Sequence, residues 1–461
     1  MELLSKSAST YLLIITRRSA SEILLLPSGW LLPRVDADSE QRLGDQLTAE
    51  AASTWKVETY CLFFPSIPQN SANAHAKCAV MDSVQNDENP PPGTRWIPRA
   101  VAIECCNSLD RAALRESLRQ MDVYATVHTT GHFACSGWLQ ELFRWAQEQL
   151  DSCGLRLTGR FRQLNASETF SLIRLEINCG AVWFKATGEP NAHELPITIA
   201  LARLFPRWLP KIFGVHAEWN GWLSEEANGA SLDGAADFAA WERAAEDLAE
   251  MQISSIGKTD ELLAAGCRDL RIPALAEQID AFIACMGELM AAQKKPAPAP
   301  LDRSELQSLA CSLREACAML QAFQLPDTIG HMDFNPGNIF VGEDRSIFLD
   351  WSEASVSNPV LTLQYLREYL SRSGMEEPAG SEKLAGVYSR RWTARYSPSE
   401  IRQALTLAPL VAVFAYAVST DSWRSIDRAT DDRLAGYYRG LARRMYRDAI
   451  EAAQRSELCL R

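Results

Sequence analysis

The segment over residues 328–358 limits the fold more than any other part of the 461-residue chain. It contains His331-x-Asp333-x4-Asn338, then two short apolar runs around a polar turn, and then Asp350. The pattern predicts a loop that carries Asp333 and Asn338, followed by a β-hairpin that returns Asp350 to the same place. The rest of the chain must therefore hold this loop and this hairpin together.

These residue types suit phosphoryl transfer. The carboxylate of Asp333 can face an incoming hydroxyl group, while the amide oxygen of Asn338 and the carboxylate of Asp350 can reach a metal ion. Magnesium prefers one or two such oxygens together with nucleotide phosphates. In phosphoryl transfer the protein contributes positioning and charge neutralisation more than covalent chemistry. We expect His331 to pack and to position the loop backbone, not to act as a base or a ligand.

Strands come before helices in the last 300 residues. Residues 170–177 and 182–185 indicate two paired strands, and a helix is expected over 192–205. From 235 onward the apolar spacing is mostly helical, interrupted by the segment over 328–358. This order predicts an α+β fold with a small β-lobe and a larger helical lobe.

The first 135 residues indicate a separate, smaller α/β domain. Short apolar and β-branched runs predict strands at 11–15, 22–26 and 57–64, with a helix over 39–54. Residues 69–92 are rich in Asn, Asp, Ser and Pro, which predicts a loop.

The chain is therefore expected to divide into four segments. These are an accessory domain over 1–135, a linker helix within 136–154, a β-lobe over 155–228 and a helical lobe over 229–461.

The stretch HMDFNPGN…FLDW resembles the catalytic and metal-binding segments of the aminoglycoside phosphotransferase family, a branch of the protein-kinase-like fold. The resemblance implies that Asp333 is the catalytic base and that Asn338 and Asp350 hold Mg²⁺. Trp351 stands where protein kinases have the Phe of Asp-Phe-Gly. The family implies a two-lobed protein-kinase-like fold and the phosphorylation of small alcohols such as antibiotics and choline.

The resemblance extends upstream to residues that would bind the nucleotide. Lys185 is expected on a strand, like the lysine that contacts the α- and β-phosphates of ATP, and Glu194 on the next helix is its expected ion-pair partner. The loop over 163–170 would cover the phosphates, but it contains no glycine. There Ser167 or Thr169 could donate a hydroxyl group to a phosphate.

The N-terminal domain loosely resembles the entry to a Nudix hydrolase domain, over residues 27–33 and the following helix. A working Nudix helix carries several glutamates that bind magnesium, whereas here Glu50 is the only acid near the expected cluster. One carboxylate is a poor metal site. We therefore expect an accessory or dimerising domain without hydrolase activity.

The composition limits the classes of binding partner and indicates the cellular compartment. The net charge of −12 and a pI near 5.2 disfavour nucleic acid and anionic membrane surfaces, and they favour a cationic substrate. The 12 cysteines are scattered, the N-terminus lacks the pattern of a signal peptide, and the longest apolar stretches are short of a membrane span. A cytoplasmic protein with reduced thiols is expected.

The sequence thus predicts an ATP- and Mg²⁺-dependent O-phosphotransferase that acts on a hydroxyl of a small molecule such as an aminoglycoside or choline. The alternative is a nucleotide-binding pseudokinase that serves as a protein-interaction module. The glycine-free loop favours this alternative, whereas the complete set of Lys185, Asp333, Asn338 and Asp350 opposes it. A protein acceptor is disfavoured because no Ala-Pro-Glu stop follows Asp350.

Overall fold

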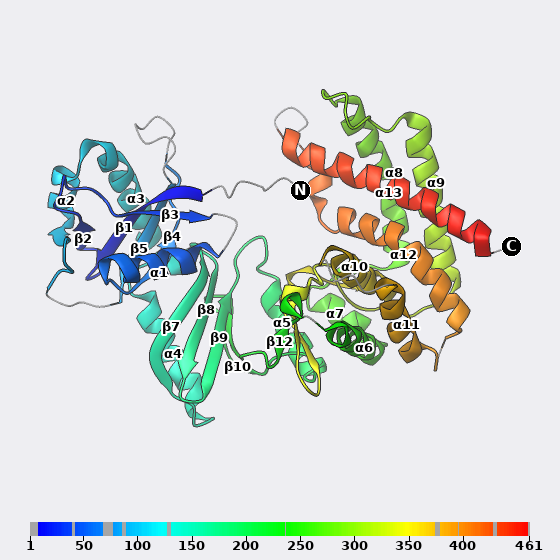
Figure 1. Cartoon of the computed structure of the whole chain (residues 1–461), viewed down its shortest axis with the longest axis horizontal. Helices are drawn as coiled ribbons and strands as arrows, with labels where there is room; N and C mark the ends of the chain where they lie inside the picture. Colours follow the sequence, from blue (N-terminus) through cyan, green and yellow to red (C-terminus); the bar gives the residue numbers. More distant parts are fainter. Residues whose placement is uncertain are drawn as a thin grey trace. The chain divides into compact units, whose positions relative to one another are not determined.

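The computed structural model describes residues 8–38, 42–67, 77–84, 89–126, 131–235, 237–373, 379–394, 396–426 and 431–459 (Figure 1). The contacts divide the chain into two compact units. Unit 1 contains Met1–Leu195 and Lys211–Glu226, and unit 2 contains Pro196–Pro210 and Ala227–Arg461.

Unit 1 begins with a six-stranded sheet of order β4-β5-β1-β2-β6, in which β3 also pairs with β1. Its strands are β1 (Ala8–Arg17), β2 (Glu22–Leu25), β3 (Arg34–Asp38), β4 (Thr59–Phe63), β5 (Lys77–Ser83) and β6 (Arg95–Pro98). Strand β1 pairs in parallel with β5 and antiparallel with β2 and β3.

Helices cover both faces of this first sheet (Figure 1). They are α1 (Leu43–Trp55), α2 (Arg99–Cys105) and α3 (Ser108–Thr126). Successive residues of β1 point to opposite faces, so Leu13 packs with Leu47 of α1, while Leu12 lies in the core that contains Leu114 of α3. The apolar run of β1 is therefore buried on both sides, and the expected α/β architecture is confirmed.

The loop predicted over 69–92 is wrong in its middle part. Residues 77–83 form β5, which lies between β1 and β4 and is buried over most of its length. Many polar and turn-forming residues surround this short apolar run, so the composition of the whole segment indicated a loop. The parts of the predicted loop over 69–76 and 85–88 lie outside the described residues, as does the start of the predicted helix at 39–41.

A second, antiparallel sheet of order β10-β11-β9-β8-β7 completes unit 1. Its strands are β7 (Leu157–Ala166), β8 (Ser171–Ile177), β9 (Gly180–Ala186), β10 (Ile212–His216) and β11 (Gly221–Glu225). Helix α4 (Trp138–Asp151) lies at the position of the expected linker helix and buries Leu139, Leu142 and Ala146, a helical spacing of three and four residues.

Both sheets of unit 1 share one hydrophobic core. The core joins Leu12 of β1, Leu142 of α4 and Leu175 of β8. Gln163 on β7 is buried and bonds both backbone groups of Cys61 on β4, accepting from its nitrogen at 2.6 Å and donating to its oxygen at 3.0 Å. The four-segment division stays a prediction, but the first sheet, α4 and the second sheet form one contact unit.

Unit 2 is mainly helical. Helix α5 (Glu194–Leu204) begins in unit 1 and continues into unit 2. The other helices are α6 (Phe238–Ser255), α7 (Thr259–Ala264), α8 (Ile272–Ala291), α9 (Arg303–Ala322), α10 (Val360–Arg372), α11 (Gly380–Trp392), α12 (Pro398–Val418) and α13 (Asp432–Cys459). Short 3-10 turns are η1 (His132–Ala134) in unit 1, and η2 (Leu232–Gly234), η3 (Pro336–Asn338), η4 (Trp351–Glu353) and η5 (Asp421–Trp423) in unit 2.

Two small sheets lie among these helices. One has the order β13-β17-β14, and the other has the order β12-β15-β16. Their strands are β12 (Ala230–Ser231), β13 (Arg268–Leu270), β14 (Thr328–His331), β15 (Ile339–Val341), β16 (Ser346–Phe348) and β17 (Ala354–Ser357). The predicted hairpin is β15 and β16, and the α+β class with strands before helices is confirmed.

Helix α12 is long and apolar enough to cross a membrane by length and composition. However, 67% of its most apolar window is buried inside the protein, where Leu407, Val411 and Phe414 belong to the core of unit 2. Burial of this kind is typical of a core helix. The cysteines whose side chains the structure describes are all free thiols.

We predict that Gly229→Ala destabilises unit 2. Gly229 has a φ of +105°, and a Cβ there would lie 2.4 Å from the backbone oxygen of Val341 on β15. Because backbone atoms cannot move aside easily and the left-handed φ disfavours a side chain, we expect a loss of about 1–3 kcal/mol in the free energy of unfolding. Urea denaturation followed by circular dichroism measures it.

Gly234→Ala is the matched control, because a Cβ at Gly234 meets nothing within 4 Å and its φ is ordinary. Equal stability of the Gly229 and Gly234 variants would contradict the close approach of Gly229 to β15.

Candidate active site

The loop between β14 and β15 is held by His331. This side chain is 1% exposed, and its Nε2 lies 3.0 Å from the backbone oxygen of Leu349, just after β16. Its ring packs against Trp351 with the centroids 4.7 Å apart, and its backbone nitrogen donates to Oγ1 of Thr362. The expectation that His331 packs and positions the loop is confirmed.

Asp333 and Asn338 lie together in this loop. The Nδ2 of Asn338 donates to the backbone oxygen of Asp333 at 3.1 Å and lies 3.4 Å from its Oδ2. Asn335, which the sequence analysis did not single out, donates to Oδ1 of Asp333 at 2.9 Å and also accepts from the backbone nitrogen of Gly337. The Asn-Pro-Gly sequence after Asp333 was the available signal, because Asn favours such turns. The carboxylate of Asp333 is thereby oriented from two sides.

Asp350 is brought to the same place by a backbone hydrogen bond. The nitrogen of Leu349 donates to the oxygen of Asn338 at 2.9 Å. Asp350, the next residue along the chain, therefore lies close to Asn338. Asp350 has a left-handed backbone, with φ 61° and ψ 66°, and its Oδ1 accepts from the hydroxyl group of Ser352 at 3.1 Å. A left-handed residue other than glycine costs about 1 kcal/mol or more and persists where the surroundings impose it, often at functional sites.

The donor set fits magnesium better than a metal held by protein alone. The nitrogen of the Asn338 amide is engaged by Asp333, which leaves its oxygen to bind a metal, and Asp350 supplies a carboxylate. Within the described ranges, no group of three or more His, Cys, Asp or Glu side chains could enclose a metal ion. One or two protein oxygens completed by substrate phosphates is the usual arrangement for Mg²⁺.

A third carboxylate, Glu353, lies near Asp333 and Asp350. Its backbone oxygen accepts from the nitrogen of Met332 at 3.2 Å, and its buried Oε2 has no hydrogen-bond partner among the described residues. Burial raises the pKa of Glu353, Arg268 opposes this change, and the nearby carboxylates of Asp333 and Asp350 add to it. Glu353 is therefore a half-buried acid, with one buried oxygen that lacks a partner, beside the loop of Asp333.

Tyrosines from three helices lie in this part of unit 2, one of them beside Asp333. The hydroxyl group of Tyr369 on α10 lies 3.5 Å from Oδ1 of Asp333. Tyr416 on α12 and Tyr437 on α13 lie near each other, and they are 38% and 45% exposed. Burial raises the pKa of Tyr437, and the charge of Glu353 contributes to this change. The sequence analysis missed all three tyrosines.

Lys185 and Glu194 form the ion pair that the sequence predicts. In unit 1, Nζ of Lys185 on β9 lies 2.6 Å from Oε1 of Glu194 at the start of α5, and the two side chains are 15% and 1% exposed. Nζ also lies 5.7 Å from the ring centroid of Trp222 on β11. A buried pair of this kind holds the ammonium group in one position.

The predicted phosphate loop is shorter than expected. Strand β7 continues to Ala166, so residues 163–166 are strand and only 167–170 form the turn into β8. Ser167 closes this turn, since its Oγ accepts from the nitrogen of Phe170 at 3.0 Å and from that of Thr169 at 3.3 Å. The turn lies beside Lys185, because Leu172 of β8 pairs with Lys185 of β9.

Comparisons with known proteins agree with this geometry. Residues 219–373 match the model of the phosphotransferase enzyme family, and this span contains Asp333, Asn338, Asp350 and Tyr369. No curated protein matches the chain.

Solved structures of small-molecule kinases are similar to the chain. A choline/ethanolamine kinase family protein from Mesorhizobium loti has 15% identity and a TM-score of 0.43, covering 67% of this chain and 94% of its own. A choline kinase from Cryptosporidium parvum has 11% identity and a TM-score of 0.47, covering 69% and 97%. A macrolide 2'-phosphotransferase from Brachybacterium faecium has 15% identity and a TM-score of 0.40, covering 62% and 95%.

The family match, together with Asp333, Asn338 and Asp350 within the matched span, confirms the resemblance to the aminoglycoside phosphotransferases. The chain therefore contains a domain of the phosphotransferase enzyme family and is a phosphotransferase.

Proposed function

We propose that the chain is an ATP- and Mg²⁺-dependent O-phosphotransferase that phosphorylates a hydroxyl group of a small cationic molecule. The observation that carries this proposal is the backbone bond from Leu349 to Asn338, which places Asp350 beside the loop of Asp333. This bond supports a single site in which Asp333 is the base and Asn338 and Asp350 supply the metal-binding oxygens.

In the proposed reaction, Asp333 accepts the proton of the acceptor hydroxyl group as the oxygen attacks the γ-phosphorus of ATP. The bond from that phosphorus to the bridging oxygen breaks, and ADP leaves. The amide nitrogens of Asn335 and Asn338 contact the carboxylate of Asp333 and orient it for proton transfer. Mg²⁺, bound by Asn338 and Asp350, would neutralise charge on the phosphates.

We assign the nucleotide phosphates to Lys185, held by Glu194, with Ser167 as a further donor. The ion pair at 2.6 Å supports the role of Lys185. Ser167 uses its oxygen lone pairs to close the turn, which leaves the hydroxyl hydrogen for a phosphate. The same bonds occupy the amides of Thr169 and Phe170, which supports weaker phosphate binding than a glycine-rich loop would give.

A cationic acceptor suits the surroundings of Asp333. Glu353 adds a third carboxylate near Asp333 and Asp350, and the partly exposed rings of Tyr416 and Tyr437 are available to a cation. The net charge of −12 adds a long-range attraction for cations. Two of the similar solved structures are described as choline kinases or as members of the choline/ethanolamine kinase family, whose names refer to small cationic alcohols.

A cytoplasmic location, the absence of nucleic-acid and membrane partners, and an accessory N-terminal domain without Nudix hydrolysis stay predictions. Unit 1 supports an accessory role for this domain, because its first sheet packs in one core with the second sheet that carries Lys185.

We predict that Asp333→Asn lowers turnover by about 10²–10⁴-fold, because an amide cannot accept the hydroxyl proton. ATP affinity should stay nearly unchanged, since Asp333 is not assigned to the nucleotide. Coupled detection of ADP measures turnover, and titration calorimetry measures ATP binding.

Asp344→Asn, in the exposed turn between β15 and β16, is the matched control and should keep full activity. Equal turnover of the Asp333 variant and the unaltered chain would remove Asp333 as the base. ATP binding with no turnover by the unaltered chain would instead favour the pseudokinase.

Asp350→Ala should abolish the dependence of ATP binding on Mg²⁺. The change removes the only carboxylate assigned to the metal, and a lone amide oxygen binds Mg²⁺ weakly. Calorimetric titration of ATP with and without MgCl₂ shows the effect, and Asp344→Ala controls for the loss of one negative charge. Persistent Mg²⁺ dependence in the Asp350 variant would place the metal elsewhere.

Glu353→Gln should raise the KM of a cationic acceptor roughly tenfold and change kcat less, because the carboxylate is proposed to bind the cation in ground state and transition state alike. Choline, ethanolamine and an aminoglycoside form the screen, with 3,3-dimethylbutan-1-ol as the uncharged analogue of choline. Preference for the uncharged alcohol, or an unchanged KM in the variant, would refute the cationic acceptor but leave phosphoryl transfer standing.

A further inference from the structure

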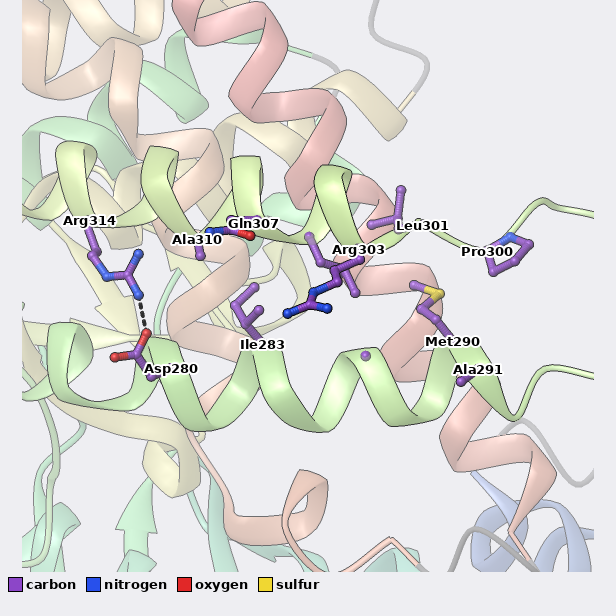
Figure 2. A pocket seen from close by; sticks show the side chains of 12 residues that line it. Asp280, Ile283, Met290, Ala291, Pro300, Leu301, Arg303, Gln307, Ala310 and Arg314 are labelled. Carbon is purple, nitrogen blue, oxygen red and sulfur yellow. Dashed lines mark hydrogen bonds and ion pairs between the residues drawn. The ribbon is translucent and has the colours of Figure 1, made fainter.

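A cavity lies between α8 and α9 of unit 2 (Figure 2). Its volume is about 600 Å³, within the range of roughly 300–1,000 Å³ that small-molecule sites occupy. None of the residues assigned to phosphoryl transfer lines it. Its wall is mainly apolar and includes Ile283, Met290, Leu306 and Ala310.

Gly287 keeps this cavity open. It lies inside the 20-residue helix α8, where glycine is less favourable than alanine. Its φ is ordinary, and a Cβ built there would meet only Cδ1 of Leu306, at 3.8 Å. Neither the backbone nor the packing therefore requires glycine at this position, and the space that glycine leaves belongs to the cavity.

Arg303 supplies a cation to the cavity. Its guanidinium lies between α8 and α9 (Figure 2), and it forms no ion pair or hydrogen bond within the part of the chain that the structure describes. By contrast, Arg314 pairs with Asp280 at the other end of the cavity. The guanidinium of Arg303 is thus available to an anion.

Arg303 is the first residue of α9, after the N-cap Asp302. The side chains of Asp302 and Glu305 form a capping box at this helix end, so the backbone there needs no further anion. The group that an anion in the cavity would pair with is therefore the guanidinium of Arg303.

We propose that this cavity binds a small amphipathic carboxylate. Its carboxylate group pairs with Arg303, and its hydrocarbon body lies against Ile283, Leu306 and Ala310 over the open space at Gly287. An inorganic anion would leave the apolar wall uncovered, and a neutral hydrocarbon would leave Arg303 unpaired. The proposal rests on unit 2 alone and does not depend on the phosphotransferase assignment.

Titration of the full chain with octanoate and with 1-octanol tests the site. Octanoate should bind saturably and more tightly than octanol. Arg303→Gln should weaken octanoate about tenfold, close to the level of octanol, and leave octanol unchanged, because only the charged head contacts the guanidinium. Arg303→Lys should restore part of the octanoate affinity.

Gly287→Leu should weaken both ligands at least roughly tenfold, because its side chain fills the space that the hydrocarbon body would occupy. Gly440→Leu is the matched control, since Gly440 lies inside α13 and a Cβ there meets nothing within 4 Å. This control should bind both ligands as the unaltered chain does.

Three results would each overturn the proposal: no saturable octanoate binding, equal affinity for octanoate and octanol, or octanoate affinity that Arg303→Gln leaves unchanged. Circular dichroism establishes that each variant is folded. If Gly287→Leu fails to fold, the exposed Arg303 variants still decide the outcome.

Discussion

The candidate active site depends on two backbone contacts at Leu349 that connect two segments of the chain. The Leu349 nitrogen donates to the oxygen of Asn338, and the Leu349 oxygen lies 3.0 Å from Nε2 of His331. One residue thus connects the loop that carries Asp333 to the hairpin that carries Asp350. Because both contacts involve the backbone of Leu349, they depend on the path of the chain and not on the side chain at that position.

The strained backbone of Asp350 is consistent with these contacts of Leu349. The left-handed conformation of an aspartate is unfavourable in isolation, so the neighbouring bonds must impose it. Trp351 stabilises the turn at Asp350, since its ring is buried against His331 and its Nε1 donates to the oxygen of Phe348 at 3.1 Å. Stability around the site therefore comes from packed aromatic rings and backbone bonds.

In unit 1, the sheet that carries Lys185 is held by side-chain contacts with the N-terminal domain. The second sheet carries Lys185, and one edge strand of that sheet, β7, contacts the first sheet through Gln163 and Cys61. Arg162 beside it binds the carboxylate of Asp45 on α1 with two nitrogens, at 2.5 and 2.6 Å. An exposed edge strand invites unwanted pairing, and coverage by another element prevents this. The first sheet thus covers the β7 edge of the sheet that carries Lys185.

The sequence by itself determined the elements whose signal is local: the loop of Asp333 and Asn338, the hairpin to Asp350, and the order of Lys185 before Glu194. Spacing along the chain sets such contacts, so they can be predicted. Only the tertiary structure decided that Tyr369 lies beside Asp333 and that Tyr437 lies near Tyr416 and Glu353, because these tyrosines come from three helices whose packing no short pattern encodes. It likewise decided that Gln163 is buried beside Cys61 instead of lying in a phosphate loop, and that β5 lies inside a predicted loop. In these cases the partners are tens of residues or more apart, and burial against them outweighs local composition.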